Sequence, residues 1–278
     1  MSPRVMTCNL SPVTFNPKMV KAAFFDIDGT LVSFRTHRIP QSTLEAVSRI
    51  RRQGVKVFIA TGRPLPFIDN LAGLEYDGIM SVNGACCTTA EGQIISQKPV
   101  PKDDIRRLVD DAKAHPMPIA FASGDRAIAV NAGKADGHLP EVFSLLNLTP
   151  PETRPIEDAL RMDVMQVIAF FTQEQEPRIM REVLKGCDAN RWHPYFADCV
   201  AKGTSKATGI DDICRHYGIA VEDTIAFGDG GNDMTMLRHD GIGIAMGNAP
   251  EEVKNVADMV TDTVDENGIS NALRRLCP

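Results

Sequence analysis

Short apolar runs alternate with amphipathic segments along the beginning of the chain. The runs, typical of strands buried on both faces, are 22–25, 55–60 and 78–82. Segment 41–53 lies between the first two, has apolar residues at helical spacing and is followed by Gly54 as a stop signal. Segment 64–72 predicts a second, shorter helix. The expected order is therefore strand, helix, strand, helix, strand.

Segment 41–53 also carries a predicted helix start. Ser42 is followed three residues later by Glu45, which is the pattern of a capping box. In this motif the serine side chain accepts a backbone hydrogen bond that the first helical turn would otherwise leave unmade. We therefore expect the helix to begin at this pair.

The same alternation resumes after residue 199. Helices are predicted at 204–217, 232–238 and 250–257, and strands at 224–228, 241–246 and 258–261. Alternating strands and helices form a parallel sheet covered by helices on both faces. We therefore predict an α/β fold with a doubly wound parallel sheet, a Rossmann-like core formed by residues 19–84 and 199–278.

Residues 85–198 do not continue the regular alternation of strand and helix, and they predict an inserted α+β domain. Alternating residues indicate a hairpin at 85–100. Helical patterns are found at 102–114, 134–147 and 175–186, and strand-like segments at 118–131, 164–171 and 190–200. Ahead of the core, residues 1–18 predict a loosely ordered N-terminal extension.

Composition argues against several classes of partner. The formal net charge is −6 and no long run of lysine or arginine is present, so a nucleic acid is not expected to bind. No apolar run approaches the roughly 18 residues that a membrane-spanning helix needs, and the N-terminus lacks the apolar centre of a secretory signal. Seven cysteines without metal-type spacing favour a reduced, cytoplasmic protein.

Polar residues follow the predicted strands at the points where the strands end. Asp26 and Asp28 come directly after the first apolar run, and Thr61 and Gly62 follow the second. In an open α/β sheet, ligands bind at the carboxyl ends of the strands. Two carboxylates this close are costly without a cation or a proton between them, so the pair indicates a metal site, acid/base chemistry, or both.

The second half of the chain adds residues of the same kinds. Asp229 ends the predicted strand 224–228, and Asn232 and Asp233 follow it in one loop. Lys206 lies near the start of a predicted helix, where the helix dipole favours anions. Four carboxylates against one lysine leave an excess of negative charge that calls for a hard divalent cation. Oxygen ligands favour magnesium.

Four stretches together resemble the motifs of the haloacid dehalogenase superfamily, the aspartate-nucleophile phosphotransferases. They are 26–31 (Asp-Ile-Asp-Gly-Thr-Leu), 57–63, 202–206 and 224–233. The insertion at 85–198, between the second and third motifs, is similar to the type-two cap domain of subclass B. Within the superfamily the chain resembles the Cof-like phosphatases and, among these, bacterial hexose-phosphate phosphatases.

This resemblance implies a role for each of these positions. Asp26 would be the nucleophile, and Asp28 would be the general acid and base. The implied cofactor is Mg²⁺, and its ligands would be Asp26, Asp28 through its backbone carbonyl, and Asp229, with Asp233 either a further ligand or a carboxylate that supports the others. The residues that would bind the phosphoryl group are Thr61, Gly62, Lys206 and Asn232.

We therefore expect a magnesium-dependent phosphatase that hydrolyses small phosphorylated metabolites, above all hexose phosphates, through an aspartyl-phosphate. A phosphohexomutase is the alternative enzyme, and pyridoxal phosphate and flavin mononucleotide are alternative substrates. A non-enzymatic phosphosugar sensor is disfavoured because Asp26 and Asp28 are both present. The expected partner is a small phosphorylated molecule, and the protein is expected to act as a monomer or weak homo-oligomer.

Two further residues are open to interpretation. His37 follows the first motif and is interpreted as a loop histidine, because the expected mechanism already has its acid and base. Asn83 precedes Gly84 and either orients groups of the site or only forms the turn that Asn-Gly favours. The sequence does not decide between these two roles.

Overall fold

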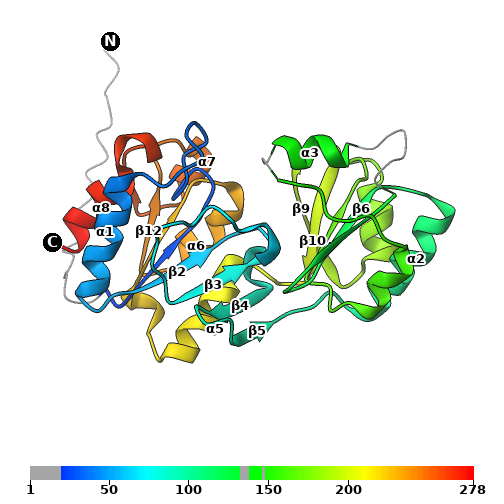
Figure 1. The fold of residues 1–278 in the computed structure, drawn as a ribbon, viewed down its shortest axis with the longest axis horizontal. Coiled ribbons are helices and arrows are strands. Elements are labelled where there is room, and N and C mark those ends of the chain that lie inside the picture. Colours follow the sequence, from blue (N-terminus) through cyan, green and yellow to red (C-terminus); the bar gives the residue numbers. More distant parts are fainter. Residues whose placement is uncertain (1–19, 132–137, 146–147) are drawn as a thin grey trace, which may run out of the picture.

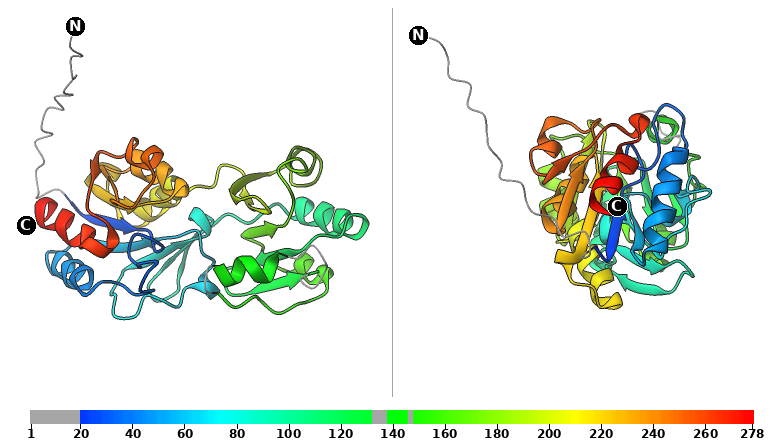
Figure 2. Two further views of the ribbon diagram at one scale, coloured as in Figure 1. Left: turned by 90° about the horizontal axis from the view of Figure 1, so that it is seen from above. Right: turned by 90° about the vertical axis from the view of Figure 1, so that its left-hand side faces the viewer.

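The computed structural model describes residues 20–131, 138–145 and 148–278. The expected extension 1–18 and parts of the expected helix 134–147 lie outside these residues. Figure 1 shows two lobes side by side, and the chain crosses between them after β5 (Ile94–Gln97) and again before α5 (Lys206–Tyr217). The C-terminal helix α8 (Gly268–Leu276) lies at the end of the molecule away from the second lobe (Figure 2).

The first lobe, which we call the core, contains an eight-stranded sheet in the order β13-β12-β11-β1-β2-β3-β4-β5. The strands from β13 to β3 are parallel, and β4 and β5 are antiparallel additions at one edge. The remaining strand bounds are β1 Ala22–Phe25, β2 Lys56–Ala60, β3 Gly78–Ser81, β4 Cys86–Thr89, β11 Thr224–Gly228, β12 Ile242–Ala245 and β13 Met259–Val260. This arrangement confirms the predicted α/β class.

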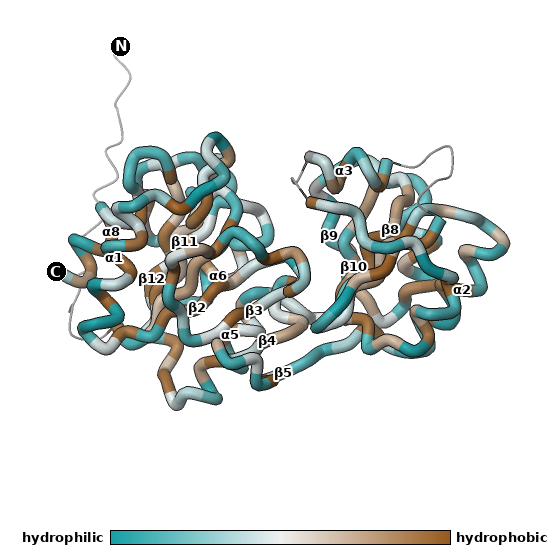
Figure 3. The backbone as a smooth tube through the Cα atoms, viewed as in Figure 1, coloured by the Kyte–Doolittle hydropathy of each residue, from teal (hydrophilic) through white to brown (hydrophobic). Residues whose placement is uncertain are grey.

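Helices cover both faces of this sheet because its strands are apolar on both sides. Ala23 and Phe25 of β1 pack with residues of α1 and α8 on one face. Ala22 and Phe24 pack with residues of α5, α6 and α7 on the other. The tube in Figure 3 is accordingly brown along much of β11 and β12. The helix bounds not yet given are α1 Gln41–Arg52, α6 Met234–His239 and α7 Glu251–Lys254.

The order in which successive strands are added to the core sheet changes direction between β1 and β11. From β1 it continues to β2 and β3 on one side, whereas β11, β12 and β13 extend the sheet on the other. A crevice forms at such a reversal, outside the carboxyl ends of the two strands, and this crevice is the usual ligand site of an open α/β sheet. Asp26 and Asp229 follow these two strands directly.

The second lobe, which we call the cap, contains an antiparallel five-stranded sheet in the order β7-β6-β8-β10-β9. Its strands are β6 Ile119–Ala122, β7 Ala127–Val130, β8 Gln166–Ala169, β9 Cys187–His193 and β10 Phe196–Ala201. Its helices are α2 Lys102–Ala114, α3 Leu139–Leu145 and α4 Glu176–Arg178. Residues of α2 pack on one face of this sheet and residues of α3 on the other.

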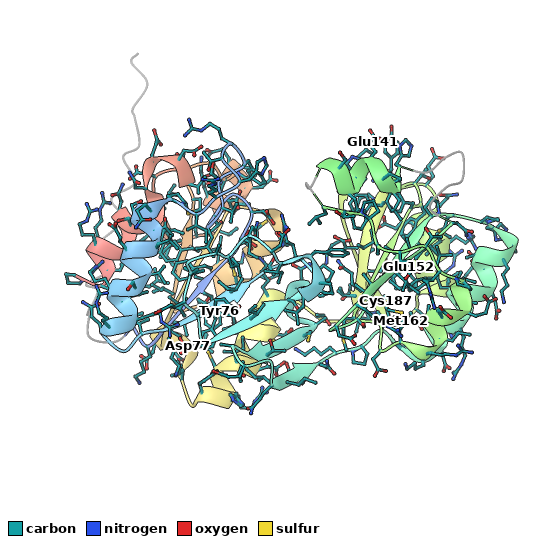
Figure 4. The ribbon with its side chains drawn as sticks, in the orientation of Figure 1. Tyr76, Asp77, Glu141, Glu152, Met162 and Cys187 are labelled. Carbon is teal, nitrogen blue, oxygen red and sulfur yellow. The ribbon has the colours of Figure 1, made fainter. Side chains whose placement is uncertain are left out.

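The carboxyl ends of the core strands face the cap. Val82, which follows β3, packs in one cluster with Met165 and Val200 of the cap. Asp77 precedes β3, and Figure 4 shows it on the side of the core away from the cap. The residues that follow β1, β2 and β11 are therefore positioned between the two lobes.

The hairpin predicted at 85–100 is present, but it does not belong to the insertion in which we placed it. Its strands β4 and β5 extend the core sheet through pairing between β3 and β4. Alternation of residues identifies a hairpin, but it does not say which sheet the hairpin joins. The exact division of the chain into core and cap stays a prediction.

Three local expectations are also corrected. Segment 64–72 contains only a 3₁₀ turn, Leu65–Phe67, and 190–200 is the greater part of a hairpin of β9 and β10 rather than one strand. The capping box at Ser42 does not form, because α1 already begins at Gln41 after Pro40. The Ser42 hydroxyl instead donates a hydrogen bond to Asn267.

Candidate active site

Lys206 lies at the centre of the site and is fully buried. It is the first residue of α5, whose Ser205 cap fixes the start of the helix. Its Nζ donates to Asp26 Oδ1 at 2.6 Å, to the backbone carbonyl oxygen of Ala60 at 2.6 Å, and to Asp233 Oδ1. An ammonium group has three protons to donate, so this set satisfies it.

Asp229 is held on both carboxylate oxygens. Oδ1 accepts a hydrogen bond from Thr30 Oγ1 at 3.0 Å, and Oδ2 accepts one from Asn248 Nδ2 at 3.1 Å. The backbone of the first motif passes close to this carboxylate, since a Cβ built on Gly29 would lie 2.2 Å from Asp229 Oδ2. Glycine also permits the positive φ of 83° at this position.

Asp233 is fully buried and holds the loop that carries Asp229. Its Oδ2 accepts the backbone N–H groups of Asp229 at 2.9 Å and Gly230 at 2.8 Å, while Oδ1 faces Lys206. Both oxygens are thus engaged within the protein. The sequence left two roles open for Asp233, and this arrangement favours support of the loop over direct metal ligation.

The buried carboxylates repel one another. Burial raises the pKa of Asp26 well above its usual range, the charge of Asp233 raises it further, and Lys206 opposes both. Burial also raises the pKa of Asp229 to about 7, with Asp233 adding to the rise and the Thr30 hydrogen bond opposing it. Burial alone would lower the pKa of Lys206, but the charges of Asp233 and Asp26 outweigh it and raise that pKa.

This donor set fits a hard divalent cation. Asp26, Asp229 and Asp233 each place one carboxylate oxygen so that the three oxygens lie within 4.8 Å of one another. Only oxygen atoms are offered, which matches the preference of Mg²⁺. A divalent cation would offset the repulsion that Lys206 leaves uncompensated.

Gly62 lies close to Asn232, and Thr61 precedes Gly62 directly after the end of β2. Thr61 is buried, and its Oγ1 accepts the backbone N–H of Arg63 at 3.0 Å. Asn232 Nδ2 donates to Asn83 Oδ1 at 3.0 Å, and a Cβ on Gly62 would lie 3.2 Å from that same oxygen. Asn83 has a φ of 51°, so it both forms the turn and holds Asn232.

The Asp28 carboxylate is paired with Arg63. Its Oδ2 and Oδ1 accept hydrogen bonds from Arg63 Nε and from a terminal nitrogen of the same guanidinium group, both at 2.7 Å. His37 has an exposed side chain and lines the same cavity of about 440 Å³ as Asp28. The structure therefore brings together all eight predicted residues, with Asp28 at the margin of the cluster.

Two residues of the site were missed by the sequence analysis. Asn248 donates to Asp229 and to the carbonyl oxygen of Gly29, and its Oδ1 accepts the N–H of Val264. It lies in the loop that follows β12, three residues after the strand ends, so a search of the loops after the strands would have found it. Arg63 was quoted in a motif but given no role, because an ion pair with Asp28 has no local sequence signal.

The fold and site define a hydrolase class, and comparison with known proteins agrees. A model of the haloacid dehalogenase-like hydrolases matches residues 23–273. The chain belongs to this family. In the part of the chain that the structure describes, no helix is long and apolar enough to cross a membrane.

Individual relatives are similar over nearly the whole chain. "Putative phosphatase YkrA" of Bacillus subtilis (strain 168) is 37% identical over 258 residues, covering 92% of this chain and 97% of its own. The solved structure of the haloacid dehalogenase subclass IIB sugar phosphatase BT4131 has a TM-score of 0.81 and 41% identity, covering 92% and 98% of the two chains. The phosphatase BT1666 of Bacteroides thetaiotaomicron has a TM-score of 0.84 and 35% identity, covering 97% and 99%. These relatives support a phosphatase.

The six described cysteines are free and buried, and Cys8 lies outside the described residues. Burial raises the pKa of Cys87 to about 12. Thiols in such surroundings are poor nucleophiles.

Proposed function

We propose that this protein is a magnesium-dependent phosphatase that hydrolyses small phosphorylated metabolites, with hexose phosphates as its preferred substrates. One observation carries the proposal. The Asp26 carboxylate lies at the reversal point of the sheet, bonded to the buried Lys206 and within 4.8 Å of two further carboxylates. Such a site can offer a nucleophile, a cation for phosphate and a place for a divalent metal.

In the first step, an Asp26 oxygen attacks phosphorus. The new bond joins Asp26 to phosphorus, the bond from phosphorus to the leaving oxygen breaks, and a proton from Asp28 passes to that oxygen. Covalent catalysis divides one difficult displacement into two easier ones. Thr61 and Asn232 hold the phosphoryl oxygens during the transfer, and the positive charge of Lys206, which is bonded to Asp26, offsets phosphate charge nearby.

In the second step, water attacks the aspartyl-phosphate. A water oxygen forms a bond to phosphorus as the bond to Asp26 breaks, and the water proton passes to Asp28. Asp28 thereby regains the proton it gave away, so one residue serves as acid and then as base. Inorganic phosphate leaves and Asp26 is restored.

Mg²⁺ would be held by Asp26, Asp229 and the backbone carbonyl of Asp28, with Asp233 supporting the loop behind them. When bound, the ion would neutralise phosphate charge and stabilise the charge that develops during transfer. Asp28 would contribute its backbone rather than its carboxylate, because the carboxylate is bonded to Arg63.

The substrate proposal rests on the similarity to a subclass IIB sugar phosphatase and on the position of the cap beyond the carboxyl ends of the core strands. A phosphohexomutase and phosphatases for pyridoxal phosphate or flavin mononucleotide are the competing assignments. We further propose a monomer or weak homo-oligomer that acts in the cytoplasm.

The test is phosphate release from a panel of phosphorylated metabolites, with Mg²⁺ and with a chelator. The panel holds hexose, pentose and polyol phosphates, pyridoxal phosphate, flavin mononucleotide and hexose bisphosphates. Magnesium-dependent release from hexose phosphates above the others is expected. Isomerisation of a hexose phosphate on addition of a bisphosphate would replace the proposal with a mutase, and preference for a cofactor phosphate would overturn the sugar assignment.

A further inference from the structure

The Asp28 carboxylate is held by a planar, two-point pair with Arg63. The two hydrogen bonds are both 2.7 Å long, and the side chains are 32% and 13% exposed. In the described part of the chain, the side-chain hydrogen bonds to this carboxylate come from Arg63 alone. Lys206, by contrast, is fully engaged with Asp26 and Asp233.

A two-point pair restricts more than distance. The guanidinium fork matches the two carboxylate oxygens, so it fixes the rotation of the carboxylate as well as its position. A carboxylate that accepts on both oxygens is ready to take a proton from water. The fork uses one lone-pair site on each oxygen and leaves another open, so the same group can carry a proton to a leaving group while the pair with Arg63 is kept.

Arg63 is itself anchored in the turn that contacts the cap. A further guanidinium nitrogen, Nη1, donates to the backbone carbonyl oxygen of Phe67 at 3.0 Å. The ring of Phe67 meets the ring of Phe143, in helix α3 of the cap, edge to face with centroids 5.5 Å apart. The chain of contacts therefore runs from Asp28 through Arg63 and Phe67 to the cap.

Space is present next to the pair on its outer side. Asp28 and Arg63 both line the cavity of about 440 Å³ that is formed by the loop after β1 and the loop after β2. A carboxylate beside open space needs a fixed partner to keep one orientation, because solvent alone leaves its rotation free. This is the position that Arg63 fills.

We infer that Arg63 is a positioning residue that sets the orientation of Asp28 for proton transfer and links that orientation to the turn on which the cap rests. This inference deepens the proposed function and rests on it. Arg63 acts through Asp28, whose carboxylate accepts from two of its guanidinium nitrogens, while the third donates to Phe67. Its loss should therefore affect steps that need Asp28 more than steps that do not.

The test compares two substrates and two steps. An aryl phosphate has a leaving group that departs without a proton, whereas a simple alkyl phosphate needs one. Rapid mixing with the aryl phosphate separates phosphorylation of Asp26, seen as a burst of the aryl alcohol, from the slower hydrolysis that follows. Arg63→Gln is expected to leave the burst rate within about threefold and to slow both hydrolysis and alkyl phosphate turnover about tenfold or more.

Further variants separate positioning from folding. Arg63→Lys keeps the charge but lacks the fork, so it should recover only part of the loss. Arg178→Gln removes another two-point pair, Arg178 with Asp111 in the cap, and should change neither the burst rate nor the rates of hydrolysis and alkyl phosphate turnover. If Arg63 acts through Asp28, adding Arg63→Gln to Asp28→Asn should cost less than about threefold further.

Two results would overturn the inference. One is an equal loss of burst, hydrolysis and alkyl turnover in Arg63→Gln, which would indicate a structural role. The other is full additivity of the two substitutions. Failure of the proposed function looks different, because the unsubstituted protein would then release no inorganic phosphate from any phosphate ester.

Discussion

Lys206 and its partners account for much of the organisation of the site at the scale of single residues. Its three donors are used by Asp26, Asp233 and the Ala60 carbonyl, so the ammonium group is held without water. A charge fixed in this way does not reorganise when phosphate charge develops. The sequence indicated a lysine near phosphate, but the packing that fully buries it depends on contacts 180 residues apart.

Asp240 is a buried acid outside the proposed site, two residues before β12. Burial raises its pKa to about 8. The Thr224 hydroxyl lies between Asp240 and the carbonyl oxygen of Val221, and one hydroxyl proton cannot serve both acceptors. A protonated Asp240 resolves this, because it donates to Thr224 while Thr224 donates to Val221.

This acid predicts a pH dependence of stability. The folded protein keeps the Asp240 proton up to about pH 8, whereas the unfolded chain loses it near pH 4. The free energy of unfolding therefore falls as the pH rises between these values. Asp240→Asn cannot ionise and should raise Tm relative to the parent by several degrees at pH 8 but little at pH 4.5.

Thermal unfolding of both proteins at the two pH values measures this difference. Asp103→Asn, at an exposed position of α2, is the control and should give a difference that does not change with pH. A Tm difference for Asp240→Asn that is the same at both values would contradict the assignment of a buried proton to Asp240.

At the scale of elements, the strands determine where the chemistry lies. β1, β2 and β11 end at the same edge of the sheet and deliver Asp26, Thr61 and Asp229 to one place. The apolar runs predicted these strands, and the polar residue after each run predicted the edge. The hairpin of β4 and β5 could not be assigned from sequence, because its pairing with β3 is a contact that alternation does not encode.

The turn after β3 has two residues in the left-handed region of the backbone. Val82 and Asn83 have φ values of 52° and 51°, which side chains rarely adopt. The turn is held by hydrogen bonds from Val82 N to the Arg63 carbonyl and from Asn83 N to the Thr61 carbonyl. It thus joins the strand end to the loop that contains Thr61 and Arg63.

Substitution of Asn83 should separate its two roles. Asn83→Ala loses the hydrogen bond to Asn232 and places a less tolerant residue at positive φ, so it should lower stability by about 1 kcal/mol and raise KM. Asn83→Gly accepts the backbone conformation and should recover stability but not KM. Unfolding curves and steady-state kinetics of both variants measure this, and an unchanged KM in both would show that Asn83 only forms the turn.

At the scale of the whole molecule, two lobes enclose the site. They touch through the cluster of Val82, Met165 and Val200 and through the Phe67–Phe143 pair. The change in the pattern of strands and helices at residues 85–198 predicted an inserted α+β domain. It could not predict these contacts, because each joins residues whose patterns are satisfied within their own lobe.

Metal binding should stabilise the molecule as a whole. Three buried carboxylates beside one lysine repel one another, and a cation relieves this repulsion. Mg²⁺ should therefore raise Tm by several degrees. At 100 times its Kd, it should add about 2.7 kcal/mol to the free energy of unfolding. Sodium chloride at matched ionic strength should not raise Tm. Asp229→Asn should lose most of the rise, and an unchanged response in that variant would exclude Asp229 as a ligand.

The measurement that tests the central claim most directly is the trapping of a phosphorylated enzyme. The protein is quenched in acid during turnover of a phosphate ester, and the modified peptide is identified by mass spectrometry. We expect one phosphoryl group on Asp26, stable to acid and released by hydroxylamine, with no label and less than about 0.1% of turnover in Asp26→Asn. Turnover without a covalent label, or activity retained by a folded Asp26→Asn protein, would contradict the account.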